Sequence, residues 1–298
     1  MSELVFPLVP RRRVVGVAFG GLRSTRRGSG SDVAGSRPYN PGDSLADIDW
    51  AASARISSAR GTAEFVVREH YADESPRVVA VADRRPAMGL KPPPRGRLQK
   101  GGALKQALAS VAASARAARG LLGFLDFADG QHVWLPPRSE HQEPPHAGRF
   151  DAPDDQLSQG LALLGRNQRD LPRGSFVFVI SDFLELPSRR EWAAALQHQW
   201  DVVPVVIQDP IWERSFPDLS GVVARFVDPR SGAIRNVRLT RSEATTLQEE
   251  NEKRWAALLE RFRSVGLECI VIDSADPRKI ASAFLRWADE RLYVRGRA

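Results

Sequence analysis

Two aspartates at the ends of apolar segments are the strongest candidates for chemistry in this sequence. Asp83 ends the run 77–83, and Asp182 lies near the end of the run 175–183. In doubly wound α/β folds, ligands bind beyond the carboxyl ends of the strands, where the strand order reverses. Two carboxylates brought together there could coordinate a hard cation such as Mg²⁺, which prefers oxygen ligands. The pair therefore raises the hypothesis of a metal-dependent hydrolase that uses Asp83 and Asp182.

The elements that would position these aspartates alternate between strand and helix. Strand patterns occur at 77–83, 121–127, 175–183, 201–207 and 267–273, and helical spacing of apolar residues occurs between them. The proline in the strand at 201–207, Pro204, favours an edge position or a bulge. This alternation predicts an α/β domain over 76–298, with a doubly wound, mostly parallel sheet. Residues 1–75 lack this alternation of strands and helices and are predicted to form a β-rich segment.

A polar and aromatic stretch at 36–55 stands outside this alternation. It contains Arg37, Tyr39, Gly42, Asp43, Ile48, Asp49, Trp50, Ala54 and Arg55. In the type and spacing of these residues it resembles the signature of the bacterial family called domain of unknown function 58. The strand that ends in Asp83 and the later run 180–184 follow the same family layout, so the resemblance covers most of the chain.

The resemblance implies a von Willebrand factor type A-like domain, in which a metal-ion-dependent adhesion site begins with Asp-x-Ser-x-Ser. Here Arg85 and Ala87 stand where the two serines would be, beside Asp83 and with Asp182 retained. Because Mg²⁺ demands near-octahedral oxygen coordination, the loss of both hydroxyls disfavours the ion. We therefore predict a degenerate site with no cofactor and no catalytic residue. Arg84 or Arg85 either replaces the ion between the carboxylates or lies solvated at a loop tip.

The signature stretch has two interpretations. In the first, Asp43, Asp49, Trp50 and Arg55 form a docking surface for a partner. In the second, which we favour, Gly42 and Asp43 make a tight turn, Asp49 caps a helix or pairs with Arg55, and Trp50 anchors the segment on the α/β core.

The family resemblance also implies a function. It points to a protein-binding scaffold or adaptor that works with a MoxR-type AAA+ ATPase in the assembly or maturation of a protein complex. One departure concerns this partner, because Ala46 and Asp47 replace an Arg-Arg pair that commonly precedes Ile-Asp-Trp.

Composition restricts the remaining alternatives. The net charge of +7 comes mostly from arginines, which cluster at 11–13 and 23–27. No aromatic residues are interleaved with these arginines as stacking platforms, so nucleic-acid binding through the N-terminus is the disfavoured alternative. No apolar run reaches the roughly 20 residues of a membrane-spanning helix, and the single cysteine, Cys269, excludes an intrachain disulfide. We expect a cytoplasmic protein.

Overall fold

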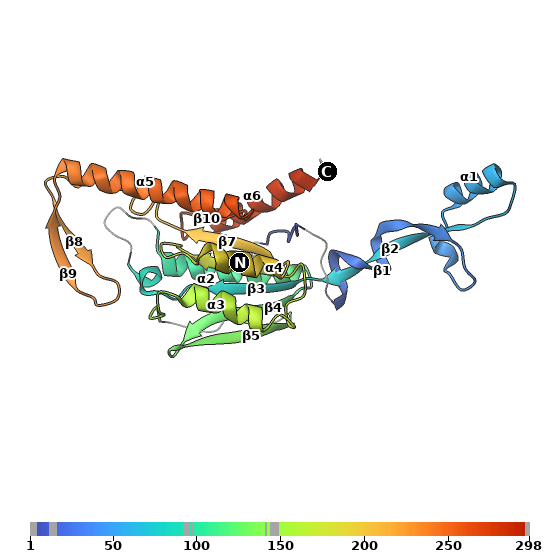
Figure 1. The fold of residues 1–298 in the computed structure, drawn as a ribbon, viewed down its shortest axis with the longest axis horizontal. Helices are drawn as coiled ribbons and strands as arrows, with labels where there is room; N and C mark the ends of the chain where they lie inside the picture. Colours follow the sequence, from blue (N-terminus) through green and yellow to red (C-terminus); the bar gives the residue numbers. More distant parts are fainter. Residues whose placement is uncertain are drawn as a thin grey trace.

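A six-stranded sheet forms the centre of the molecule (Figure 1). The computed structural model describes residues 5–11, 17–91, 96, 98–140, 142–143 and 149–295, without the side chains of 17–32, 71–74 and 295. The sheet has the order β10-β7-β6-β3-β4-β5. Its strands are β3 (Arg77–Ala82), β4 (Leu121–Ala128), β5 (Gln131–Ser139), β6 (Phe176–Ser181), β7 (Asp201–Ile207) and β10 (Ile270–Ile272).

Every neighbouring pair in this sheet is parallel except β4 with β5. The first strand of the sheet along the chain, β3, lies between β4 and β6, so the strand order reverses there. The prediction of a doubly wound, mostly parallel sheet is confirmed. Pro204, however, lies inside the sheet, in β7. β10 begins opposite Val205, one residue later, so the missing N–H of Pro204 costs no ladder bond on that side.

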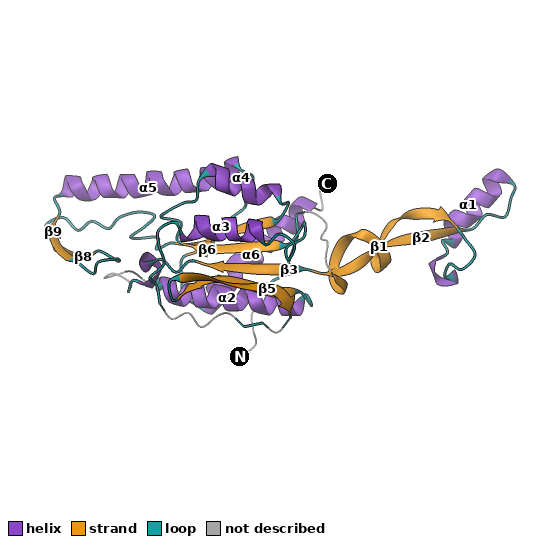
Figure 2. Cartoon of the chain, turned by 60° about the horizontal axis from the view of Figure 1, so that its bottom comes forward, coloured by secondary structure: helices purple, strands orange, loops and turns teal. Residues whose placement is uncertain are grey.

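Helices cover both faces of the sheet, as Figure 2 shows. One apolar core includes α2 (Lys100–Ala117) and α6 (Pro277–Arg295), and the other includes α3 (Gln156–Arg166), α4 (Arg189–Gln197) and α5 (Arg241–Ser264). Capping boxes begin α4, at Ser188 with Glu191, and α5, at Thr240 with Glu243; Ser or Thr followed three residues later by Glu is a helix-start signal that can be read from the sequence alone.

The N-terminal segment 5–11 packs on the α/β body through three of its apolar side chains. Phe6 stacks on Phe284 of α6 with ring centroids 4.4 Å apart, and Leu8 and Val9 are buried in the same core. The predicted domain boundary at 75/76 falls between the arm strand β2 (Val66–Ser75) and β3. That boundary stays a prediction, and the contacts of Phe6 show that part of the first 75 residues packs with the second unit.

Two hairpins extend from opposite ends of the sheet (Figure 1). The longer one, which we call the arm, covers residues 17–75 and pairs β1 (Val17–Pro38) with β2; its outer end carries η1 (Leu45–Asp47) and α1 (Trp50–Arg60). The shorter one pairs β8 (Val223–Val227) with β9 (Ile234–Arg238) in an antiparallel ladder. None of the helices in the described ranges combines the length and apolar character that a bilayer crossing requires.

Candidate functional site

Asp83 and Asp182 lie together at the point where the strand order reverses. They follow the neighbouring parallel strands β3 and β6, and the backbone N–H of Asp83 donates to the carbonyl of Ile180 at 3.0 Å. Their relative exposures are 0 % and 1 %. The sequence therefore identified the correct place for a polar site, and the surroundings of the two carboxylates decide its chemistry.

Arg85 occupies the space between the two aspartates. Its Nη2 donates to Asp83 Oδ2 at 2.6 Å and lies 3.4 Å from Asp182 Oδ1, and its Nε donates to Asp83 at 3.0 Å. Ser181 Oγ donates to the same Asp83 oxygen at 2.6 Å. Burial lowers the pKa of Arg85, but the bond to Asp83 and the nearby carboxylates outweigh it and raise the pKa. Arg85 is therefore held as a buried cation.

Arg84 points to a different carboxylate. Its Nε and Nη2 donate to the two oxygens of Asp126 at 2.7 and 2.8 Å, and both residues are buried. Of the alternatives left open by the sequence, the structure thus places Arg85 against both candidate aspartates. Neither arginine is solvated.

Lys100 supplies a second cation that the sequence did not reveal. Its Nζ donates to Asp182 Oδ2 at 2.8 Å and to Glu213 Oε1 at 2.7 Å. Burial lowers the pKa of Lys100, but Asp182 and Glu213 more than compensate, so the pKa is raised overall. The three residues come from distant parts of the chain, and no local motif links them. We call Asp83, Arg85, Lys100, Asp182 and Glu213 the ion-pair cluster.

The ion-pair cluster does not fit Mg²⁺. Both aspartates already bond to cations, and an added divalent ion would lie beside a guanidinium and an ammonium group. Ala87, in η2 (Pro86–Gly89), has no side-chain oxygen to offer. Within the described part of the chain, no three His, Cys, Asp or Glu residues are grouped so that they could hold a metal ion.

The signature residues form a second polar site at the outer end of the arm. Arg37 donates through Nη1 and Nη2 to the two oxygens of Asp43 at 2.6 and 2.7 Å, and its Nε lies 3.3 Å from Glu69. The bond from Arg37 and one from the Asn40 backbone lower the pKa of Asp43 to about 2. Gly42 has a φ of +106°, which a residue with a side chain would adopt only with strain.

Asp49 begins helix α1. Its Oδ1 accepts from the backbone N–H of Ala52 at 2.9 Å, and its Oδ2 accepts from Arg68 Nε at 3.0 Å. Arg68 is the largest cause of the lowered pKa of Asp49. The predicted cap is present. The alternative pairing with Arg55 is not, because the Nε of Arg55 instead donates to the carbonyl of Ala51 in its own helix.

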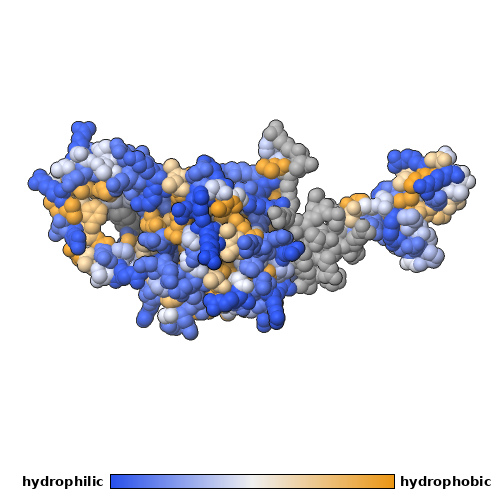
Figure 3. All heavy atoms as spheres, in the orientation of Figure 1, coloured by the Kyte–Doolittle hydropathy of each residue, from blue (hydrophilic) through white to orange (hydrophobic). Residues whose placement is uncertain are grey.

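Trp50 is exposed, and the prediction that it anchors the arm on the α/β core is wrong. Its relative exposure is 63 %, and its ring meets Phe65 edge-on at 5.9 Å. Tyr39 meets Phe65 from another side at 6.4 Å. The prediction failed because β1 and β2 are long and carry this cluster away from the sheet. Figure 3 shows apolar atoms at the surface there. We call Tyr39, Trp50 and Phe65, with exposed Leu45, the arm tip.

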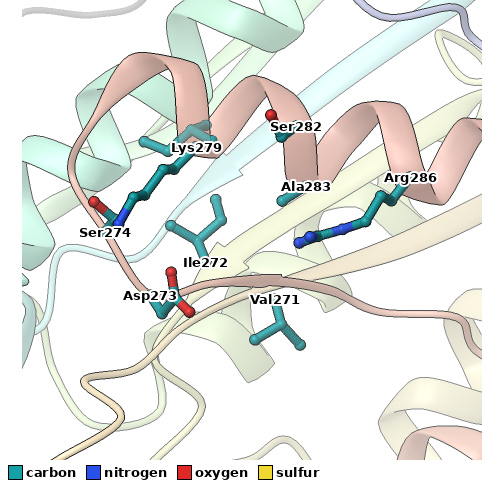
Figure 4. A pocket seen from close by; sticks show the side chains of 9 residues that line it. Val271, Ile272, Asp273, Ser274, Lys279, Ser282, Ala283 and Arg286 are labelled. Carbon is teal, nitrogen blue, oxygen red and sulfur yellow. The ribbon is translucent and has the colours of Figure 1, made fainter.

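A cavity of about 310 Å³ lies away from both sites. It is bounded by β10 and the first half of α6, and Lys279 and Arg286 reach toward it from the helix (Figure 4). Asp273 is the one carboxylate in its lining. The cavity therefore does not coincide with the paired aspartates that the sequence singled out.

Comparison with known proteins assigns the family. The model described as "Protein of unknown function DUF58" matches residues 35–254. The chain therefore belongs to this family, which confirms the resemblance carried by the signature residues. The comparison with curated proteins found no match.

Three solved structures are similar to the chain. BatB from Bacteroides thetaiotaomicron, a conserved hypothetical protein, is 16 % identical with a TM-score of 0.37, over 72 % of this chain and 99 % of that one. An aerotolerance-related membrane protein from Bacteroides fragilis is 15 % identical with a TM-score of 0.32, over 63 % and 99 %. A von Willebrand factor type A protein from Catenulispora acidiphila is 14 % identical with a TM-score of 0.32, over 74 % and 43 %. Similarity at this level of sequence identity and TM-score supports no functional assignment for this chain.

Proposed function

We propose that this protein is a non-enzymatic adaptor that binds another protein through the arm tip. The family resemblance points to a MoxR-type AAA+ ATPase as the partner. Together the two proteins would act in the assembly or maturation of a protein complex. The observation that carries the proposal is the aromatic cluster at the end of a projecting arm, in which exposed Trp50 and half-buried Tyr39 belong to the family signature and both contact Phe65.

The arm tip has the properties of an interface anchor. Tryptophan and tyrosine dominate the energetic centres of protein interfaces, because they bury a large area with few rotatable bonds. Two ion pairs, Arg37 with Asp43 and Asp49 with Arg68, hold the turn at 40–43 and the start of α1, both of which come just before Trp50 in the chain. The aromatic surface is thus pre-organised, which lowers the entropy cost of binding.

The other two functions have less support. A hydrolase at Asp83 and Asp182 would need carboxylates free to bind a metal or a proton, whereas both are bonded to buried cations. The structure offers no support for nucleic-acid binding through the N-terminal arginines. Arg12 and Arg13, and the side chains of Arg23, Arg26 and Arg27, lie outside the described residues.

Affinity measured with purified components tests the proposal. We expect the full chain to bind the MoxR-type ATPase of the same genome, and Trp50→Ala to weaken the complex by about 30-fold, or about 2 kcal/mol. Tyr293→Ala is the matched control, because Tyr293 is an aromatic residue with the same 63 % exposure on a different part of the chain. No binding by the wild-type chain, or equal losses in the two variants, would contradict the proposal.

A further inference from the structure

The β8–β9 hairpin presents an apolar face that nothing in the described chain covers. Residues paired across an antiparallel ladder share a face, and the pairs here are Val223 with Arg238, Arg225 with Asn236, and Val227 with Ile234. The three aliphatic residues are 61 %, 46 % and 49 % exposed, in the order Val223, Val227, Ile234. We call these six residues the outer face of the hairpin.

An uncovered two-stranded sheet is an unfavourable arrangement. Such hairpins are marginally stable in water unless a third strand or a helix packs on them. The opposite face, with Ala224, Phe226 and Val237, is half-buried, whereas the outer face is exposed along its whole length. In Figure 1 the hairpin lies at the far end of α5, away from the central sheet. A partner that covered the outer face would remove aliphatic surface from water.

The charges of the hairpin indicate the character of that partner. Residues 222–241 contain five arginines and one aspartate. Asp228 is used within the turn, where it accepts from the backbone of Arg230 and Ser231. Among the residues that the structure describes, Arg225 and Arg238 form no ion pair with a carboxylate. The outer face therefore combines unpaired positive charge with aliphatic surface, and its complement is acidic and aliphatic.

We propose that the outer face binds an acidic amphipathic helix of a partner protein. Two strands and their side chains span roughly 10 Å, which is the diameter of one helix. Leucine-type residues of the helix pack on Val223, Val227 and Ile234, and its carboxylates pair with Arg225 and Arg238. The outer face has no aromatic residue on which a nucleic-acid base could stack. This site lies at the opposite end from the arm tip and does not depend on the function proposed for it.

A designed peptide tests this inference on the full chain. The probe is a fluorescent helical peptide of about 18 residues, with leucines on one side and glutamates on the other. We expect saturable binding by fluorescence anisotropy, with backbone NMR shifts confined to β8 and β9. Arg225→Glu combined with Arg238→Glu should weaken binding at least tenfold, and Val223→Ser combined with Ile234→Ser should do the same.

Matched controls separate this site from general attraction to a basic protein. Arg173→Glu, at an exposed loop position, should leave affinity unchanged, and so should Trp50→Ala at the arm tip. Circular dichroism checks that each variant keeps its fold. The proposal is overturned if the glutamate peptide does not bind, if the charge-reversed chain binds it equally well, or if a single-stranded oligonucleotide binds the hairpin in its place.

Discussion

The ion-pair cluster and the arm tip use the same chemistry in opposite surroundings. Asp83 forms an ion pair with Arg85 in the core, and Asp43 forms one with Arg37 at the surface. Each pair has a short guanidinium–carboxylate contact of 2.6 Å. In the core, loss of one partner leaves the other charge buried and unpaired, away from water. At the surface, water takes over much of the lost interaction. The comparison teaches that the buried arginine governs stability, whereas the exposed one governs the local shape of a contact surface.

The largest expected effect follows from Arg85→Met. This change leaves Asp83 buried without its cation, and we expect the free energy of unfolding to fall by about 3–5 kcal/mol. Urea denaturation measures it. Arg173→Met, at an exposed arginine, should stay within about 0.5 kcal/mol of the wild type. If the two variants were equally stable, the cluster would not contribute as we describe.

A smaller, local effect is expected from Arg37→Gln. Removing the guanidinium breaks its contacts with Asp43 and Glu69, but these groups are only partly buried and lie outside the apolar core. We expect the global unfolding midpoint to stay unchanged, while the amide of Asn40, which donates to Asp43 at 2.8 Å, exchanges its hydrogen about tenfold faster. Hydrogen-exchange NMR reports both quantities. A large global loss would mean that the arm tip is part of the cooperative core.

Acid should loosen the arm tip over a defined pH range. The folded-state pKa of Asp43, about 2, lies below its ordinary value of 3.8. The pairing therefore stabilises the tip fully above about pH 4, and this stabilisation is lost as the pH falls toward 2. We expect Asn40 to lose exchange protection through that range before amides of β6 do. Protection that did not change between pH 5 and pH 2 would argue against the Arg37–Asp43 pair.

The smallest expected effect is that of Mg²⁺ on thermal stability. Because Arg85 and Lys100 already bond to the aspartates, millimolar Mg²⁺ should not shift the melting temperature of the wild-type chain. A specific ligand at 100 times its Kd would add about 2.7 kcal/mol. Such a stabilisation, absent from Asp182→Ala, would show that the ion displaces the arginine and that the cluster is a working metal site.

Local sequence signals predicted the α/β body well. Helical and strand periodicity located its main elements, and Ser188–Glu191 and Thr240–Glu243 marked the starts of α4 and α5 correctly. The sequence also placed Asp83 and Asp182 at strand ends; the structure adds that these two parallel strands are neighbours, so both carboxylates lie at the same edge of the sheet. These features depend on residues close together in sequence, or on topology that the alternation itself imposes.

Features set by distant contacts were not predictable. No sequence motif links Lys100 to Glu213. The neighbouring sequence also does not determine whether Arg84 or Arg85 forms the ion pair with Asp83. The error at Trp50 came from β1, whose second half is rich in glycine and serine and does not have the pattern of a strand. Pairing with β2 nevertheless extends β1 to Pro38 and moves the signature far from the core.

Site-specific photocrosslinking tests the central claim most directly. A benzoylphenylalanine placed at position 50 of the full chain reports what the arm tip touches in cells, and the same group at position 293 serves as the control. We predict an adduct with the AAA+ ATPase from position 50 alone. An intramolecular adduct between position 50 and the central sheet, or an ATPase adduct from position 293 instead, would contradict the assignment of the arm tip as the partner-binding surface.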